Sequence, residues 1–80
     1  MNQTSGRTLV DSRGSSCPGP ITDLAIAYRR SKVGDVIELW ATDPGVKADV
    51  NAWATKTSNQ IVSIDETGEK ITVIIRITKR

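Results

Sequence analysis

The sequence contains no histidine and no phenylalanine, and it contains a single cysteine. One cysteine cannot form a disulfide within the chain. Without histidine, neither a zinc site of the usual ligand type nor a Cys–His hydrolase can be built. We therefore expect no metal and no cofactor. Because a lone cysteine without disulfides is typical of a reducing compartment, we expect a cytoplasmic protein.

Long apolar runs and dense charge are also missing. No segment approaches the length of a membrane span, and the polar residues 1–6 lack the apolar core of a secretory signal. The net charge is only +2, with acidic and basic residues interleaved. We therefore expect no membrane insertion, and the weak charge argues against nucleic-acid binding. The basic residues expected on the helices are read as plain surface rather than as a dock for an acidic partner: Arg29, Arg30, Lys47 and Lys56.

What is present fits one small domain of 80 residues, with a flexible tail over residues 1–6 and a single folded unit over residues 7–80. Apolar alternation predicts four strands, over 7–11, 36–41, 61–64 and 71–77. Apolar residues at helical spacing predict two helices, from about 20 to 32 and from 44 to 57. Asp43 is expected to cap the second helix, with Pro44 at its first helical position.

The order βαβαββ with right-handed crossovers places both helices on one face of a four-stranded mixed sheet. We therefore predict an α/β two-layer sandwich whose first three strands run parallel and whose fourth runs antiparallel. One face of the last strand, formed by Ile71, Val73, Ile75 and Ile77, is expected to be buried. Trp40 and Trp53 could gate a site, but we expect them to fill a core that lacks phenylalanine.

The cysteine lies in the run Ser16-Cys17-Pro18-Gly19-Pro20. The prolines have a fixed φ and no N–H, so they favour a stiff, non-helical mount directly before a helix. Free N–H groups at a helix start stabilise a thiolate, and Arg13 is close enough in sequence to add positive charge. These features favour a reactive Cys17, although a small buried cysteine is the alternative.

A lone thiol leaves few kinds of chemistry. Without a second cysteine, a dithiol oxidoreductase of the CxxC type is excluded. A thiol that accepts a group, holds it and passes it on needs only nucleophilic attack and exposure. A peroxide-sensing thiol would require a resolving cysteine from elsewhere. A non-catalytic interaction or regulatory module, including one that binds RNA, is the other alternative.

The run from Asp11 to Pro20, read as D-S-R-G-S-S-C-P-G-P, resembles the D-x-R-G-x-x-C-P-x-P signature of the TusA-like (SirA-like) sulfurtransferases. The resemblance continues through 33–35 and 42–44 to the hairpin at Gly68 and the last strand. It implies that Cys17 is the catalytic residue, carrying sulfur as a persulfide or a thiosulfonate. The positions that would support Cys17 are Arg13, Gly14, Pro18, Gly19, Pro20 and Asp43.

The resemblance also implies a relay between proteins. The sulfur donor would be a cysteine desulfurase, a rhodanese or a DsrE-like protein. The acceptor would serve tRNA thiolation, molybdenum cofactor synthesis or sulfur oxidation. We expect the chain to be a monomer by itself. Its predicted fold is also similar to the C-terminal domain of bacterial translation initiation factor three, which keeps the RNA-binding alternative open.

Overall fold

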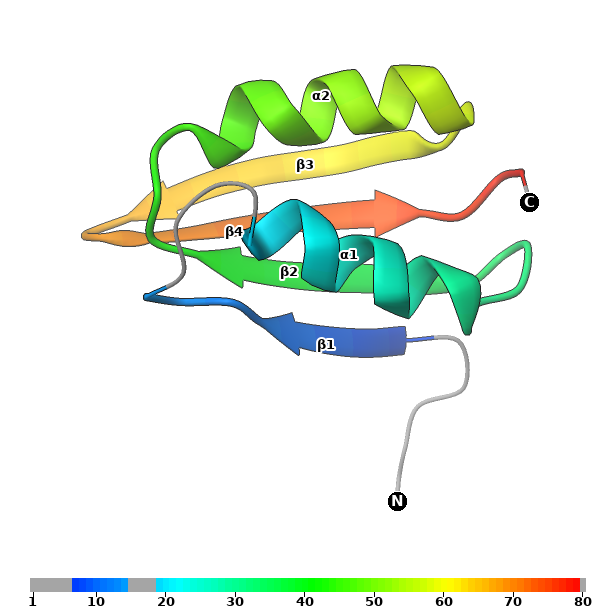
Figure 1. Ribbon diagram of the computed structural model, residues 1–80, viewed down its shortest axis with the longest axis horizontal. Helices are drawn as coiled ribbons and strands as arrows, with labels where there is room; N and C mark the ends of the chain where they lie inside the picture. Colours follow the sequence, from blue (N-terminus) through cyan, green and yellow to red (C-terminus); the bar gives the residue numbers. More distant parts are fainter. Residues whose placement is uncertain (1–6, 15–18, 80) are drawn as a thin grey trace.

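The structure is a computed structural model that describes residues 7–14 and 19–79. Figure 1 shows the helices and strands along the chain. Their bounds are β1 (Arg7–Asp11), α1 (Gly19–Arg29), β2 (Val36–Ala41), α2 (Val46–Thr57), β3 (Gln60–Thr67) and β4 (Lys70–Arg76). The predicted order βαβαββ is confirmed. No helix in these described ranges is long and apolar enough to cross a membrane. The tail expected over residues 1–6 lies outside them.

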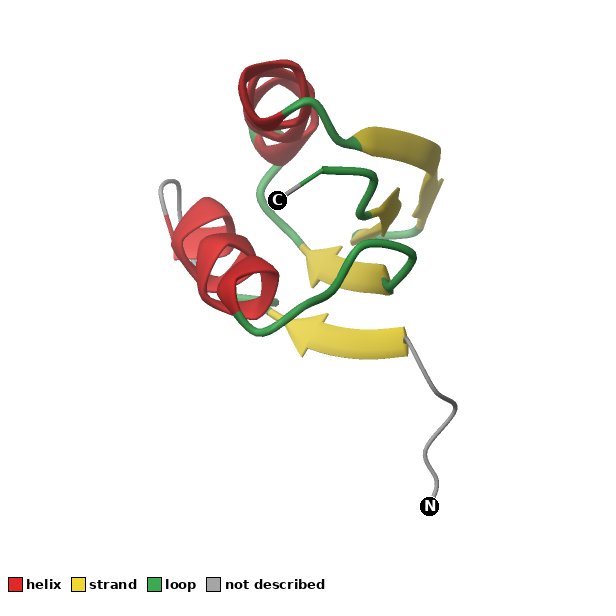
Figure 2. Cartoon of the chain, turned by 90° about the vertical axis from the view of Figure 1, so that its right-hand side faces the viewer, coloured by secondary structure: helices red, strands yellow, loops and turns green. Residues whose placement is uncertain are grey.

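The four strands form one mixed sheet in the order β1-β2-β4-β3. Strands β1 and β2 are parallel, whereas β4 is antiparallel to both β2 and β3. Figure 2 shows both helices on the same side of the sheet. The predicted α/β two-layer sandwich is therefore confirmed. Because β1 leads to α1 and parallel β2 leads to α2, both strand-to-helix connections lie at the carboxyl ends of these strands. This end of the sheet is called the site edge.

The core lies between the helices and the covered face of the sheet. Burial alternates along β2, where Ile37, Leu39 and Ala41 point inward. The predicted buried face of the last strand is confirmed, since all four of its apolar residues are almost fully buried. The helices contribute the remaining core residues, which are Leu24, Ala27, Val46, Val50 and Ala54. Packing of these aliphatic side chains supplies the main favourable free energy of folding.

Helix α1 ends three residues earlier than the sequence predicted, at Arg29 rather than Lys32. The N–H groups of Arg30 and Ser31 donate to carbonyls three residues back, at 3.1 and 3.0 Å. The buried hydroxyl of Ser31 also donates to the carbonyl of Ala27, at 2.8 Å. These bonds use the last carbonyls of the helix and tighten its final turn, which is a common way for a helix to end.

Strand β3 is longer than predicted and contains a bulge. Its register with β4 shifts between Ile61 and Ser63, so Val62 is the extra residue and is 50% exposed. The bulge changes the alternation, and it allows both Ile61 and Ile64 to pack against the core although they are three residues apart. The strand continues to Thr67 before a two-residue turn at Gly68, which has a φ of +60°.

Candidate functional site

The predicted site lies at the sheet edge where β1 leads to α1 (Figure 1). Cys17 and Pro18 fall outside the described residues, so their predicted roles stay predictions. The structure describes both flanks, from Asp11 to Gly14 on one side and from Gly19 on the other. Pro20 is buried in the first turn of α1 and Gly19 is half-buried. The second proline of the motif, Pro20, is therefore packed into the fold.

Arg13 is held by Asp11. The Nε and Nη2 atoms of Arg13 each donate to one carboxylate oxygen of Asp11, both at 2.8 Å. The backbone N–H of Arg13 donates to the same carboxylate at 3.2 Å. These hydrogen bonds and the positive charge lower the pKa of Asp11 to about 2. Because the guanidinium already balances a carboxylate, its positive charge is partly neutralised before it can act on a neighbouring thiol.

Ser12 connects the end of β1 to both of its neighbouring elements. Its hydroxyl donates to Oδ2 of Asp23 on α1 at 2.7 Å, and its N–H donates to the carbonyl of Trp40 on β2 at 2.8 Å. Ser12 is only 2% exposed and Asp23 is half-buried, so the side-chain bond is partly shielded from water. The bond fixes the start of α1 relative to the end of β1.

Gly14 joins this flank to the second strand-to-helix connection. Its N–H donates to Oγ1 of Thr42, which follows β2, at 2.9 Å. The residue has a φ of +84°, and a Cβ built on it would meet nothing within 4 Å. Glycine is therefore required here by the backbone conformation and not by lack of space. The contact brings residues 11–14 and 42–43 to the same edge, as the predicted site requires.

The predicted cap of the second helix is wrong. Helix α2 begins at Val46 with Gly45 as its N-cap, and no side chain caps it. The Oδ1 atom of Asp43 instead accepts from the N–H of Gly45 at 3.0 Å. The backbone carbonyl of Asp43 accepts from the N–H of Val46, also at 3.0 Å. Asp43 and Pro44 therefore form a tight turn before the helix. An aspartate side chain that bonds the backbone two residues later competes with capping.

The sequence model of the TusA sulfurtransferases matches residues 8–77, which span both flanks and the whole sheet. The chain belongs to the TusA sulfurtransferase family. This match confirms the resemblance inferred from the sequence.

Several TusA relatives span nearly the same length. A candidate sulfur carrier of Archaeoglobus fulgidus is 27% identical over 71 residues, which cover 89% of this chain and 97% of that protein. The sulfur carrier protein TusA of Allochromatium vinosum is 33% identical over 67 residues, covering 84% of this chain and 88% of the relative. A Bacillus subtilis relative, YrkF, is 34% identical over 68 residues; they cover 85% of this chain but only 37% of that longer protein.

The TusA fold is also found in a solved structure. The SirA-like protein of Desulfitobacterium hafniense superposes with a TM-score of 0.78 and covers 90% of this chain and 99% of that one. The sequence identity is 18%, so this likeness supports the fold and not the chemistry.

Trp40 departs from the expected core role. It lies on the open face of the sheet with Glu38, whose carboxylate accepts from the indole Nε1–H at 2.7 Å. The guanidinium of Arg13 lies 4.9 Å from the centre of the ring, and Nζ of Lys70 lies 3.7 Å from it. These cation–π contacts make Trp40 a support for Arg13 beside the site. The open face of the sheet therefore carries an aromatic ring beside the predicted site.

The prediction for Trp53 is confirmed. Its ring packs against the core and meets the ring of Tyr28 edge-on, with centres 5.4 Å apart. Three residues at the site edge were missed from the sequence, namely Ser12, Asp23 and Thr42. A serine or a threonine in a polar loop, or an aspartate on a helix, gives no sign of a tertiary partner 11 or 28 positions away. No sequence signal in the single chain would have identified these contacts.

Proposed function

We propose that the chain is a sulfur carrier that accepts a sulfane sulfur atom on Cys17 and passes it to a partner protein. The observation that carries the proposal is the family match over residues 8–77, an interval that includes the only cysteine of the chain. The relatives named as sulfur carriers in Allochromatium vinosum and Archaeoglobus fulgidus support the same role. The cargo is a persulfide or, with a sulfonate-bearing donor, a thiosulfonate.

The described flanks suit a reactive thiol. Helix α1 begins at Gly19, two residues after Cys17 along the chain. Within this described helix, the first turn carries no acidic side chain. Unpaired N–H groups and the partial positive charge of a helix start favour a thiolate over a thiol. We infer that the helix, more than the partly neutralised Arg13, supplies the stabilisation.

The transfer step needs no metal and no net oxidation. The thiolate of Cys17 attacks the terminal sulfur of a donor persulfide, R–S–SH. A new S–S bond forms to Cys17, the S–S bond of the donor breaks, and the donor leaves as the thiolate R–S⁻. The proton of the terminal sulfur moves with it, giving Cys17–S–SH. An acceptor thiolate then repeats the attack and releases Cys17 as a thiolate.

The donor and acceptor belong to this proposal as classes of protein. A cysteine desulfurase, a rhodanese or a DsrE-like protein would supply the sulfur. An acceptor in tRNA thiolation, molybdenum cofactor synthesis or sulfur oxidation would receive it. In this relay the chain acts as a sulfurtransferase whose substrate remains covalently bound between two encounters.

Mass spectrometry of the intact chain tests the proposal. After incubation with a cysteine desulfurase and cysteine, or with thiosulfate or polysulfide, the wild-type chain should gain the mass of one sulfur atom. With tetrathionate, which loses thiosulfate as the leaving group, it should gain the mass of one thiosulfonate group. Cys17→Ser should gain nothing. Dithiothreitol should return the loaded chain to its starting mass. An equal gain on Cys17→Ser, or no gain with any of these donors, would rule out the carrier function.

A further inference from the structure

One of the two outer strands of the sheet, β1, has an unprotected side. Among the described residues β1 pairs only with β2, so its outer edge has no partner strand. The opposite edge strand, β3, carries the bulge at Val62, a feature that prevents strand pairing. Strand β1 has no proline, lysine or bulge, and its central residue Leu9 is 53% exposed.

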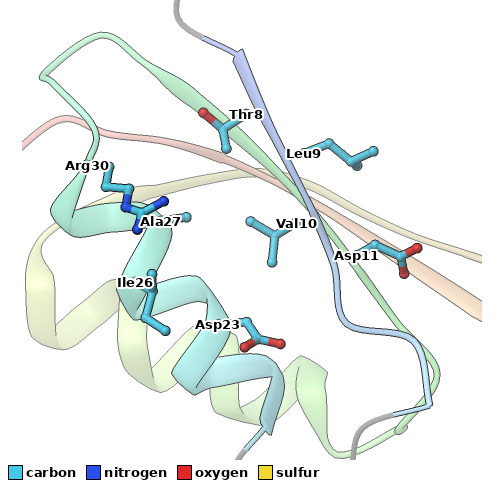
Figure 3. A pocket seen from close by; sticks show the side chains of 8 residues that line it. All are labelled: Thr8, Leu9, Val10, Asp11, Asp23, Ile26, Ala27 and Arg30. Carbon is cyan, nitrogen blue, oxygen red and sulfur yellow. The ribbon is translucent and has the colours of Figure 1, made fainter.

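A groove runs along this free edge, between β1 and α1. Its volume is about 440 Å³. Thr8 and Val10 lie on the side of β1 that faces α1, and Leu9 lies on the other side (Figure 3). Ile26, which is 45% exposed, provides the apolar wall on the helix. An exposed groove with apolar residues at its centre, beside an unpaired strand, is a typical place for another strand to bind.

The groove carries opposite charges at its two ends. Asp23 lies at the end of the groove near Asp11, and Arg30 lies at the end near Thr8 (Figure 3). The side chain of Arg30 forms no ion pair with any residue that the structure describes. Asp23 and Arg30 are seven positions apart, so they share one face of α1, with Ile26 between them.

We propose that a second copy of this chain binds this groove, with the two β1 strands pairing antiparallel across a two-fold axis at Leu9. In this register Thr8 of one copy stands opposite Val10 of the other, and the two Leu9 residues stand opposite each other on the axis. The charges that favour the antiparallel arrangement lie on α1.

The same two-fold axis also aligns the helices. Because α1 runs antiparallel to β1, the two copies of α1 would run antiparallel to each other on the same side of the joined sheet. Asp23 of each copy would then face Arg30 of the other, and the two Ile26 side chains would meet near the axis. One axis thus pairs the two β1 strands and sets Asp23 of each copy against Arg30 of the other, as an isologous interface requires. This surface departs from the monomer expected from the sequence.

Sedimentation of the Cys17→Ser chain tests this proposal independently of the sulfur chemistry, because that variant cannot carry sulfur. Its average mass should rise toward that of a dimer with increasing concentration. Adding Arg30→Glu, which sets like charges against Asp23 of the other copy, should weaken dimerisation about tenfold or more. Arg29→Glu is the matched control, because it makes the same charge change on an exposed residue of α1 outside the groove. Equal effects of the two variants, or a monomer at all concentrations, would overturn the proposal.

A cysteine cross-link tests the register. In the Cys17→Ser chain, Leu9→Cys should form a disulfide dimer on mild oxidation. Residues directly opposite in an antiparallel pair have Cα atoms about 4.5–5.5 Å apart, which suits a disulfide. Val62→Cys, equally exposed on the bulged edge, is the control and should cross-link far more slowly. If both cross-link at the same rate, collision explains the result and the proposal fails. If the groove instead binds an added extended peptide while the chain stays monomeric, the occupant is not a second copy.

Discussion

The buried hydroxyl of Ser12 connects β1 to α1 through Asp23 at 2.7 Å. Replacing Ser12 by alanine leaves the Asp23 carboxylate without this donor, so we predict a loss of about 1–3 kcal/mol in the free energy of unfolding. Urea denaturation followed by tryptophan fluorescence measures it. Ser63→Ala, on an exposed residue of β3, should change the midpoint very little. Equal losses for the two variants would show that the Ser12–Asp23 bond contributes nothing specific.

The exposed ion pair between Asp11 and Arg13 predicts a pH dependence. The hydrogen bonds from Arg13 lower the pKa of Asp11 from 3.8 to about 2. Because the folded value is the lower one, the stabilisation is present above about pH 4 and disappears as the pH falls toward 2. The stability difference between wild type and Asp11→Asn should therefore vanish over this range. Water screens the pair, so the difference should be small and should shrink further in high salt. A difference that stays constant down to pH 2 would contradict this assignment.

The position of Trp40 on the open face of the sheet could have been predicted from the sequence. Strand alternation places Trp40 on the same face as Glu38 and opposite Leu39, and this parity predicts an open-face position. The expectation of a core tryptophan relied on residue type instead. The pairing of Arg13 with Asp11 depends on side-chain geometry, which spacing alone does not determine.

At the level of elements, helix α2 ends at a residue, Ser58, whose backbone conformation is unfavourable for serine. Ser58 has a φ of 63° and a ψ of 35°, in the left-handed region. Glycine adopts this conformation without steric cost, so Ser58→Gly should stabilise the fold by about 0.5–1 kcal/mol. Thermal unfolding measures the change. Ser63→Gly, in an extended strand, is the control and should destabilise it. A lower melting temperature for Ser58→Gly would mean that the serine side chain contributes more than the backbone strain costs.

The bounds of a strand could be predicted where its apolar residues form an almost continuous run. They could not be predicted where polar residues continue the strand. Strand β2 has the predicted bounds because it is an apolar run, interrupted only by Glu38, with polar residues directly before and after it. Strand β3 extends over Asp65, Glu66 and Thr67, which the sequence marks as turn residues. The strand can continue there because an edge strand tolerates polar side chains on both faces. The start of α2 was misplaced because Asp43 can either cap a helix or form a turn, and sequence does not distinguish them.

At the level of the whole molecule, the contacts that fix the flanks of the site join β1, β2, α1 and the loop before α2. We predict that Cys17→Ser changes the free energy of unfolding by less than about 0.5 kcal/mol, as for a surface position. Chemical denaturation of both chains under reducing conditions measures this difference. A loss above about 2 kcal/mol would instead identify Cys17 as a buried residue of the core, the alternative reading of this thiol.

The topology of the molecule explains why a site at this edge could be predicted although its contacts could not. Parallel strands followed by helices bring 11–14 and 42–43 together whatever their side chains are. Which groups then bond, such as Gly14 to Thr42, depends on loop conformations that only the folded backbone defines. The sequence therefore predicts the neighbourhood of the site, and the structure adds the bonds that hold it.

The bond between Ser12 and Asp23 has a consequence for how such a chain can change. It closes an interval of eleven positions, and the segment between Gly14 and Gly19 lies inside that interval. A loop whose two ends are fixed independently can exchange its residues without loss of the fold. Substitutions inside this interval are therefore expected to leave the fold intact, so that selection for stability acts mainly on residues outside it.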